Sequence, residues 1–344
     1  LFFDYTWQDA LFFRFGKHTI AWGAGYFFSP ADVLNLTAVD PEDPTAEREG
    51  PVSLRVGYPF GLTGNATLYI IANQGIEPRD VAVAPLVEFV AGPGELGIGA
   101  YYQRALAPRI MSLYTASVGD ADLFAEGVFL VGSDRVFVRP SSDQSAAEAD
   151  PDDGYDIVVE TYREERRAFL QATVGGRYLY QLEAGGTLLI AGQYFFNGEG
   201  YSGEVDGLLP AAARLALNPT ENGRLILNPA EQPEGYEAPP ALGFDDLANF
   251  GRHYLGATVS VSGLPWDRVS VALFGLVNLS DFSAIVSPTI SISFLERFSV
   301  ATSLRFTLGP SDGELTDPAS LFLGQEATPT AGLTISVSMP GGSF

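Results

Sequence analysis

The chain has 344 residues, no cysteine and a net charge of −23. The missing cysteines exclude disulfides and thiolate metal sites, and the acidic balance argues against a nucleic-acid partner, because such affinity depends on Lys and Arg at phosphates. No run approaches the roughly 18 apolar residues of a membrane helix, and no signal peptide is visible.

Strands are predicted from the first residues of the chain. Residues 1–7 and 10–22 are predicted strands joined by a tight turn at Gln8-Asp9. A long loop follows over residues 23–50. Within it, Ser29-Pro30-Ala31-Asp32 predicts the start of a short helix reaching about Leu36, because Ser caps helices well and Pro suits the first helical position.

The middle of the chain is a series of predicted hairpins with Gly-rich turns. Long loops at residues 135–164 and 198–252 interrupt them; both are acidic, and the second holds a helix-like piece at 209–217. The predicted strands are residues 52–58, 66–73, 86–90, 95–104, 109–118, 121–132, 166–180 and 187–197.

Residues 253–308 predict four consecutive strands with strict alternation, and residues 330–339 a last strand after a loop at 309–328. Each strand has an apolar face and a face of small polar residues, because side chains alternate with period 2. Soluble strands usually have about 5–6 residues, whereas these reach the roughly 9–11 that a tilted membrane strand needs. The pattern favours a membrane barrel with its apolar face toward lipid. The alternative is a soluble sandwich or lipocalin-like barrel with that face inward.

Loop lengths support the membrane barrel. About 15 strands are predicted, and every long connection is even-numbered, as expected for short periplasmic turns and long extracellular loops. We therefore predict an all-β fold, an antiparallel transmembrane β-barrel, as a single domain over residues 1–344. Bacterial barrels have even strand numbers, so we expect 16 strands in the full protein, an N-terminal truncation here and a gap beside residues 1–7. Pro288 predicts a bulge.

Aromatic residues are expected to form girdles at the two membrane interfaces, where Trp and Tyr are enriched. The group near the short turns is Tyr58, Trp266, Phe294 and Phe298; the group near the long loops is Trp22, Tyr101, Tyr102, Tyr194, Phe196 and Tyr254.

One stretch carries a family resemblance. The run Gly16-Lys17 through Trp22-Gly23, then Phe28-Ser29-Pro30-Ala31-Asp32-Val33-Leu34-Asn35, resembles poorly characterised, porin-like Gram-negative outer-membrane barrels with a WG…SPxDxLN segment. The resemblance implies porin-like membership and transfers no substrate. Its motif residues are Trp22, Gly23, Ser29, Pro30, Asp32 and Asn35. The terminal Phe344 resembles the C-terminal aromatic signal of such proteins, although Pro340-Gly341-Gly342 departs from its alternating form.

If the apolar face meets lipid, charged residues on the other face line the pore. Such charges set selectivity in channels; alternatively they pair and fill a closed lumen. The predicted pore-lining residues are Arg14, His18, Arg55, Gln103, Asp122, Glu126, Arg167, Arg177 and Arg305.

Catalysis is not predicted, because neither His18 nor His253 is placed beside a distinguished serine. No cofactor or tightly bound metal is expected; the acidic cluster at residues 150–156 suggests at most loosely bound calcium, since it lacks the full spacing of a calcium loop. Expected partners are outer-membrane lipid and lipopolysaccharide, small polar solutes, and either further copies in a homotrimer or a surface protein.

Two function classes remain open for a barrel in a Gram-negative outer membrane. The first is a porin or substrate-selective diffusion channel for small polar solutes. The second is a closed barrel acting as an adhesin, surface-layer anchor or scaffold through its long acidic loops. The apolar helix-like pieces in loops 23–50 and 198–252 need burial, so both loops are expected to reach toward or into the barrel mouth.

Overall fold

The computed structural model describes residues 1–46, 48–72, 77, 79–104, 106–140, 159–183, 185–201, 212, 240–243, 245–264, 268–294, 298–310, 313–316 and 331–338. In this part of the chain, no helix is long and apolar enough to cross a membrane.

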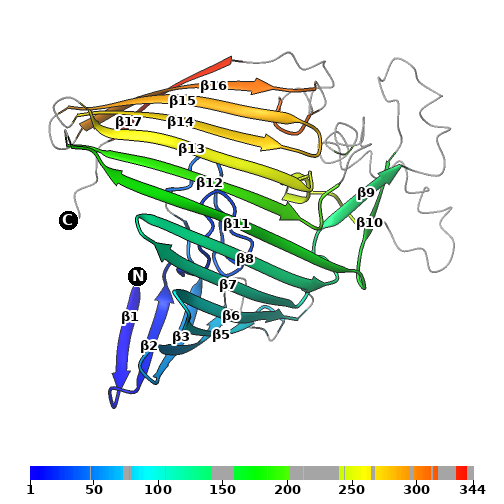
Figure 1. Cartoon of the computed structure of the whole chain (residues 1–344). Coiled ribbons are helices and arrows are strands. Elements are labelled where there is room, and N and C mark those ends of the chain that lie inside the picture. Colours follow the sequence, from blue (N-terminus) through cyan, green and yellow to red (C-terminus); the bar gives the residue numbers. More distant parts are fainter. Residues whose placement is uncertain are drawn as a thin grey trace.

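The structure is all-β and dominated by one antiparallel sheet of 15 strands, in agreement with the predicted strand count. Neighbours in the sheet are neighbours in sequence, apart from β9 and β10, which the sheet omits (Figure 1). The strands are β1 Phe2–Trp7, β2 Leu11–Lys17, β3 Val52–Phe60, β4 Gly64–Ile71, β5 Ala82–Ala91, β6 Gly94–Gln103, β7 Arg109–Val118, β8 Ala121–Val131, β11 Ala168–Gln181, β12 Thr187–Asn197, β13 His253–Leu264, β14 Val269–Asn278, β15 Ser283–Phe294, β16 Phe298–Leu308 and β17 Ala331–Ser338.

The predicted loop at residues 135–164 contains a hairpin that the sequence analysis missed. Strands β9 (Val136–Pro140) and β10 (Val159–Arg163) pair as a separate two-stranded sheet. Phe137 of β9 stacks on Phe169 of β11 with ring centroids 5.7 Å apart, which fixes this hairpin at one end of the main sheet. The acidic cluster at residues 150–156 lies outside the described residues.

The longest connections all leave the same end of the sheet, as predicted from their parity. They join β2 to β3, β8 to β11, β12 to β13 and β16 to β17. Leu1 lies at this long-connection end, because its carbonyl accepts the N–H of Lys17, the last residue of β2. Within the described residues, no pairing joins β1 to β17.

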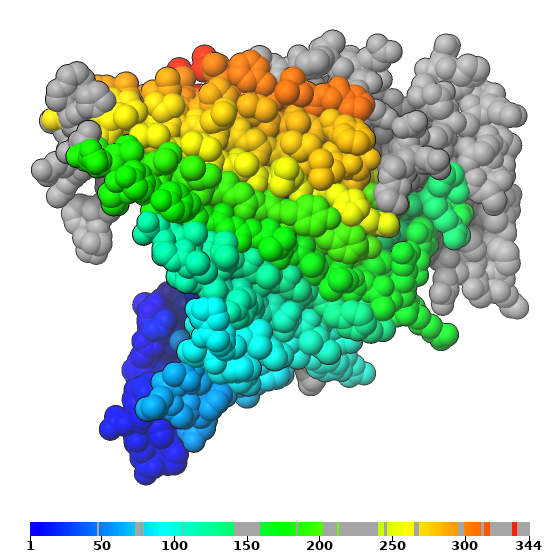
Figure 2. All heavy atoms as spheres, in the orientation of Figure 1, coloured from blue at the N-terminus to red at the C-terminus, as the bar shows by residue number. Residues whose placement is uncertain are grey.

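The two faces of the sheet differ in the way the alternation predicts. On the outer face, large apolar side chains are uncovered on strand after strand: Leu255 is 45%, Leu273 51% and Leu304 41% exposed. Strands β11 to β16 form a continuous surface on this face (Figure 2). On the inner face, residues such as Thr173, Gln193 and Thr307 are buried. Residues 18–50, hereafter the inner segment, lie against that face behind β8, β11 and β12 in Figure 1.

Two predictions about residues 10–36 are wrong. Strand β2 ends at Lys17 rather than residue 22, because Ile20 and Trp22 turn inward and are buried. The Asn35 side chain there replaces a strand partner, accepting the Ile20 N–H at 2.9 Å and donating to its carbonyl at 2.8 Å. Residues 29–36 form turns and no helix, because the Ser29 hydroxyl donates to another strand instead of capping its own backbone.

Pro288 produces no bulge. Val286 pairs with Phe306 and Thr289 with Ser303, so the register of β15 against β16 is unchanged across the proline. A register shift occurs instead between Val261 and Leu264 of β13.

The prediction of aromatic girdles is wrong for three residues, and for the others it stays a prediction. Trp22 and Tyr254 are 2% and 1% exposed, and Tyr101 packs on the buried cluster of the inner face, so these three do not face outward. Trp266 and the Phe298 side chain fall outside the described residues. The remaining members are at least partly exposed on the outer face: Tyr58, Tyr102, Tyr194, Phe196 and Phe294.

Candidate functional site

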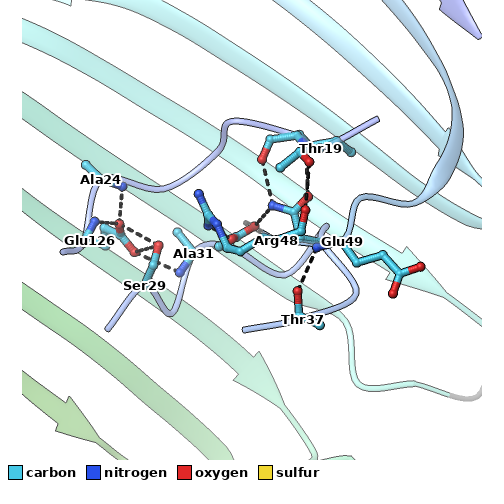
Figure 3. Close-up of polar contacts among 12 residues, drawn as sticks. Thr19, Ala24, Ser29, Ala31, Thr37, Arg48, Glu49 and Glu126 are labelled. Carbon is cyan, nitrogen blue, oxygen red and sulfur yellow. Dashed lines mark hydrogen bonds and ion pairs between the residues drawn. The ribbon is translucent and has the colours of Figure 1, made fainter. Parts of the chain in front are cut away.

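The candidate site is the space enclosed between the inner face of the sheet and the inner segment. The segment is fastened to β8 by a single carboxylate (Figure 3). Glu126 is only 4% exposed. Its Oε1 accepts the N–H groups of Ala24 and Gly25 at 2.5 and 2.6 Å, and its Oε2 accepts that of Ala31 at 3.0 Å. The Ser29 hydroxyl donates to both oxygens at 3.0 and 3.1 Å. Successive backbone N–H groups thus form an anion-binding concavity around Glu126.

Gly23 makes this concavity possible. Its φ is +104°, a conformation that favours glycine, and a Cβ there would come 2.2 Å from the Ser29 Oγ. The glycine of the WG motif therefore lets the chain close around the Glu126 carboxylate.

A second clamp comes from β12. Gln193 is 2% exposed, and its Oε1 accepts the N–H groups of Tyr26 and Phe27 at 2.9 and 2.6 Å. Its Nε2 donates to the Phe28 carbonyl and the Thr173 hydroxyl, both at 2.5 Å. The Gln193 side-chain amide thus bonds backbone groups of three consecutive residues, so residues 26–28 are held to β12 through their backbone.

The inner segment also contacts β16, and further ion pairs join residues within the segment and tie its end to β2. Arg305 donates to both oxygens of Glu42 at 2.8 and 3.1 Å, a bidentate pair. Arg48 pairs with Asp32, and Lys17 with Glu49. The segment that begins after β2 therefore contacts β8, β12 and β16, which lie successively farther along the sheet.

Apolar packing completes the attachment. Ile20, Trp22 and Leu34 are buried in one cluster with inner-face residues such as Met111 and Val128. Phe28 stacks on Phe195 of β12, with ring centroids 4.7 Å apart and planes at 15°. Burial of side chains of this size contributes about 1.5–3 kcal/mol each, so packing and hydrogen bonds both hold the segment in place.

Another carboxylate fastens the connection between β16 and β17. Glu314 accepts the N–H groups of Phe250 and Gly251, both at 2.9 Å, and the Tyr254 hydroxyl at 2.5 Å. It also accepts the Asn278 side-chain amide at 2.9 Å. This contact draws the connection onto the inner face at the long-connection end, beside Phe27 and Phe28.

Cavities lie on both sides of the inner segment. A cavity of about 740 Å³ at the short-turn end is lined by Tyr26, Glu95, Asp122 and Arg177. At the long-connection end, cavities of about 450 and 300 Å³ share Pro30, Arg109, Gln171 and Glu199 among their lining residues. The inner segment therefore lies between two vestibules, each lined by both polar and apolar groups.

Several charges in this space are paired. In the short-turn cavity, Arg177 donates to Asp122 at 3.0 Å, and Ser117 donates to the same carboxylate at 2.7 Å. Toward the other end, Arg109 donates to Asp134 at 2.7 Å. Among the described residues, no group of three or more His or acidic side chains could hold a metal ion.

The Asp32 carboxyl gives the inner segment a pH dependence. Burial raises the pKa of Asp32 to about 6, outweighing the lowering effects of Arg48 and Asn35. A folded-state pKa above the unfolded value means that the native state binds more protons, so stability falls as the pH rises from about 4 to about 6. The full difference corresponds to roughly 3 kcal/mol. Asp32→Asn is expected to flatten the stability profile in urea over this range; an unchanged slope would assign it to another group.

Eight of the nine predicted pore-lining residues have side chains on the inner face, and their pore-lining role stays a prediction. They form separate pairs and clusters rather than one ring: Arg14 with Asp4, Gln103 with Tyr101, Arg177 with Asp122, Arg305 with Glu42, Glu126 with the inner segment, and His18 with Arg55 near Arg14. Arg167 is exposed just before β11, its guanidinium 5.1 Å from the Phe169 ring centre.

The motif residues all belong to the inner segment, where Trp22, Gly23, Ser29, Pro30, Asp32 and Asn35 pack, turn or hydrogen-bond as described above. Four further residues of the site were not predicted from the sequence: Gln193, Glu42, Arg48 and Glu314. Gln193 had a usable signal, because it is a polar residue at an inward position of the apolar strand Thr187–Asn197. The others lie in connections, where no periodicity assigns a direction.

No family model and no curated protein matches the sequence. Two solved structures from Acinetobacter baumannii align with most of the chain. OccAB1 aligns with a TM-score of 0.44 and 8% identity over 88% of this chain and 69% of its own. OccAB4 aligns with a TM-score of 0.41 and 10% identity over 87% of this chain and 68% of its own.

Proposed function

We propose that the protein is an outer-membrane porin or substrate-selective diffusion channel for small polar solutes, in a Gram-negative bacterium. The inverted polarity of the sheet carries the proposal. Large apolar side chains are uncovered on the outer face, while Glu126, Gln193, Thr173 and Asn197 are buried on the inner one.

Water is a poor solvent for the outer face. Leaving a Leu, Val or Phe side chain exposed forgoes about 1.5–3 kcal/mol, and soluble monomers rarely expose contiguous apolar patches beyond a few hundred Å². Lipid removes this cost. Strands with all backbone groups paired in a closed barrel are also one of the few structures that can span a bilayer.

The two ends of the sheet suggest an orientation. Long connections are external and short turns periplasmic in barrels of this kind. Solutes would then enter at the cavities near Arg109 and Glu199, pass the inner segment and leave through the cavity near Asp122 and Arg177. The paired Arg and acidic groups along this route favour polar solutes.

Planar-bilayer recording of the purified, refolded chain tests the proposal. We expect stepwise ion currents from single insertions. In swelling assays, the protein should speed the entry of small neutral polar solutes into proteoliposomes. It should not speed the entry of apolar solutes of similar size.

The second candidate is a closed barrel that acts as an adhesin, surface-layer anchor or scaffold. One observation favours it: aromatic side chains such as Phe27, Phe28 and Tyr254 pack together on the inner face where the inner segment and the Glu314 connection meet, and they occupy part of the long-connection end. Membrane insertion without measurable current would exclude the channel and support this alternative.

A further inference from the structure

Polar side chains gather on the inner face of β2 and β3 around Gly16. Arg14 of β2 lies directly opposite Arg55 of β3, and Gly16 lies opposite Ser53. His18 follows two residues after Gly16, and its backbone N–H bonds the Pro51 carbonyl. Gly16 itself has a φ of +127°, and a Cβ there would come 2.5 Å from the Leu1 carbonyl oxygen and 2.8 Å from Phe2 Cα, so the start of β1 packs closely against Gly16 between Arg14 and His18.

Three buried polar atoms of this cluster have no hydrogen-bond partner: Ser53 Oγ, Arg55 Nε and His18 Nε2. Ser53 as a whole is only 2% exposed. Buried polar groups are nearly always paired, so three unpaired atoms on adjacent positions need an explanation. A bound ligand supplies one.

The charged side chains of the cluster favour an anionic ligand. Arg14 is held by Asp4 through hydrogen bonds of 2.8 and 3.0 Å. In the part of the chain that the structure describes, no carboxylate pairs with Arg55. Like charges directly opposite on a sheet repel, so the Arg14–Arg55 pair carries an excess positive charge that an oxyanion would neutralise.

His18 refines the chemistry of the ligand. Its Nδ1 lies 3.2 Å from the Gly16 carbonyl, which can only accept, so the neutral ring carries its proton on Nδ1. Burial, and then the nearby Arg14 and Arg55, keep the pKa of His18 below its ordinary value. The unpartnered Nε2 is therefore an acceptor at neutral pH, beside the donors of Arg55 and Ser53.

We propose that this cluster is a binding site for an oxyanion that also carries a hydroxyl, with inorganic phosphate as the simplest case. Oxygens of phosphate accept from Arg55 and Ser53, and its O–H donates to His18 Nε2. The Phe2 ring, which lies 4.3 Å below the Arg14 guanidinium and edge-on to His18, covers the site. The inference rests on the proposed channel only for the route by which the anion arrives.

Calorimetric titration of the refolded full chain with sodium phosphate and sodium sulfate at neutral pH tests the site without requiring conductance. Phosphate should bind and sulfate should bind more weakly, because sulfate has no hydroxyl for His18. Arg55→Gln should weaken phosphate binding about tenfold or more, as expected for hydrogen bonds to charged groups. The control Arg79→Gln removes the same charge from an exposed connection and should leave binding unchanged.

His18→Phe tests the contribution of the phosphate hydroxyl separately from that of the anionic charge. It should reduce phosphate binding to the level of sulfate and leave sulfate binding unaltered. Glycerol phosphate shares the chemistry of inorganic phosphate, and tighter binding of the ester would identify an organic phosphate as the solute.

Equal phosphate affinity in Arg55→Gln and Arg79→Gln would overturn the site, and equal affinity of the wild type for phosphate and sulfate would overturn the role of His18. If Arg55→Gln does not fold, Arg55→Lys keeps the charge, loses the planar fork and should still weaken binding. Phosphate binding by a chain that passes no current would refute the channel and leave this site standing.

Discussion

In the proposed channel, Glu126→Gln should raise the single-channel conductance severalfold. The carboxylate accepts three backbone N–H groups and the Ser29 hydroxyl, whereas an amide places an NH₂ group against some of these donors. Each lost hydrogen bond to a charged group costs roughly 1.5–3 kcal/mol. We expect the inner segment to leave β8 and the passage between the two vestibules to widen, which bilayer recordings would measure directly.

Asp122→Asn is the matched control for Glu126→Gln. Both substitutions neutralise one carboxylate on the inner face of β8, but Asp122 contacts Ser117 and Arg177 rather than the inner segment. A similar conductance change in the two variants would mean that charge, not release of the segment, controls the current.

Leu304→Arg should destabilise the folded barrel in lipid by about 2–4 kcal/mol, the cost of a basic side chain near the bilayer midplane. Leu304 lies in the middle of β16 on the outer face and is 41% exposed. Folding titrations in phospholipid vesicles would measure the loss.

Ser303→Arg is the neighbouring control and should be mild. Ser303 points to the inner face, where its hydroxyl lies 3.0 Å from Thr289 Oγ1. If Ser303→Arg proves more damaging than Leu304→Arg, the outer face does not meet lipid and the membrane assignment fails.

The strands and their directions could be predicted because alternation acts at every residue of a half-buried sheet. Period 2 separated the face that carries Leu304 from the face that carries Arg305, and strand length and loop parity favoured placing the first outward; both assignments agree with the observed exposure. The common end of the long connections followed from counting, since each strand reverses the direction of the chain.

The inner segment could be anticipated in outline and not in detail. Its apolar residues needed burial, so an inward path was expected, but no periodicity indicates that Gln193 would bind residues 26–28 or that Glu42 would reach Arg305. The helix expected after Ser29 fails for the same reason: local capping preference competes with Glu126, which is distant in sequence and therefore invisible to a local pattern.

The distances in sequence between the inner segment and its anchors imply an order of assembly. Ala24 bonds a residue 102 positions away, Tyr26 one 167 away and Glu42 one 263 away. Contacts between such distant residues form slowly, because a long loop must close before they can stabilise anything. The salt bridge to Arg305 can form only when β16 exists, so it is the last of these three contacts that the order of the chain permits, after those with β8 and β12. In the proposed barrel, residues 18–50 would therefore reach their final position only after β16 has been added.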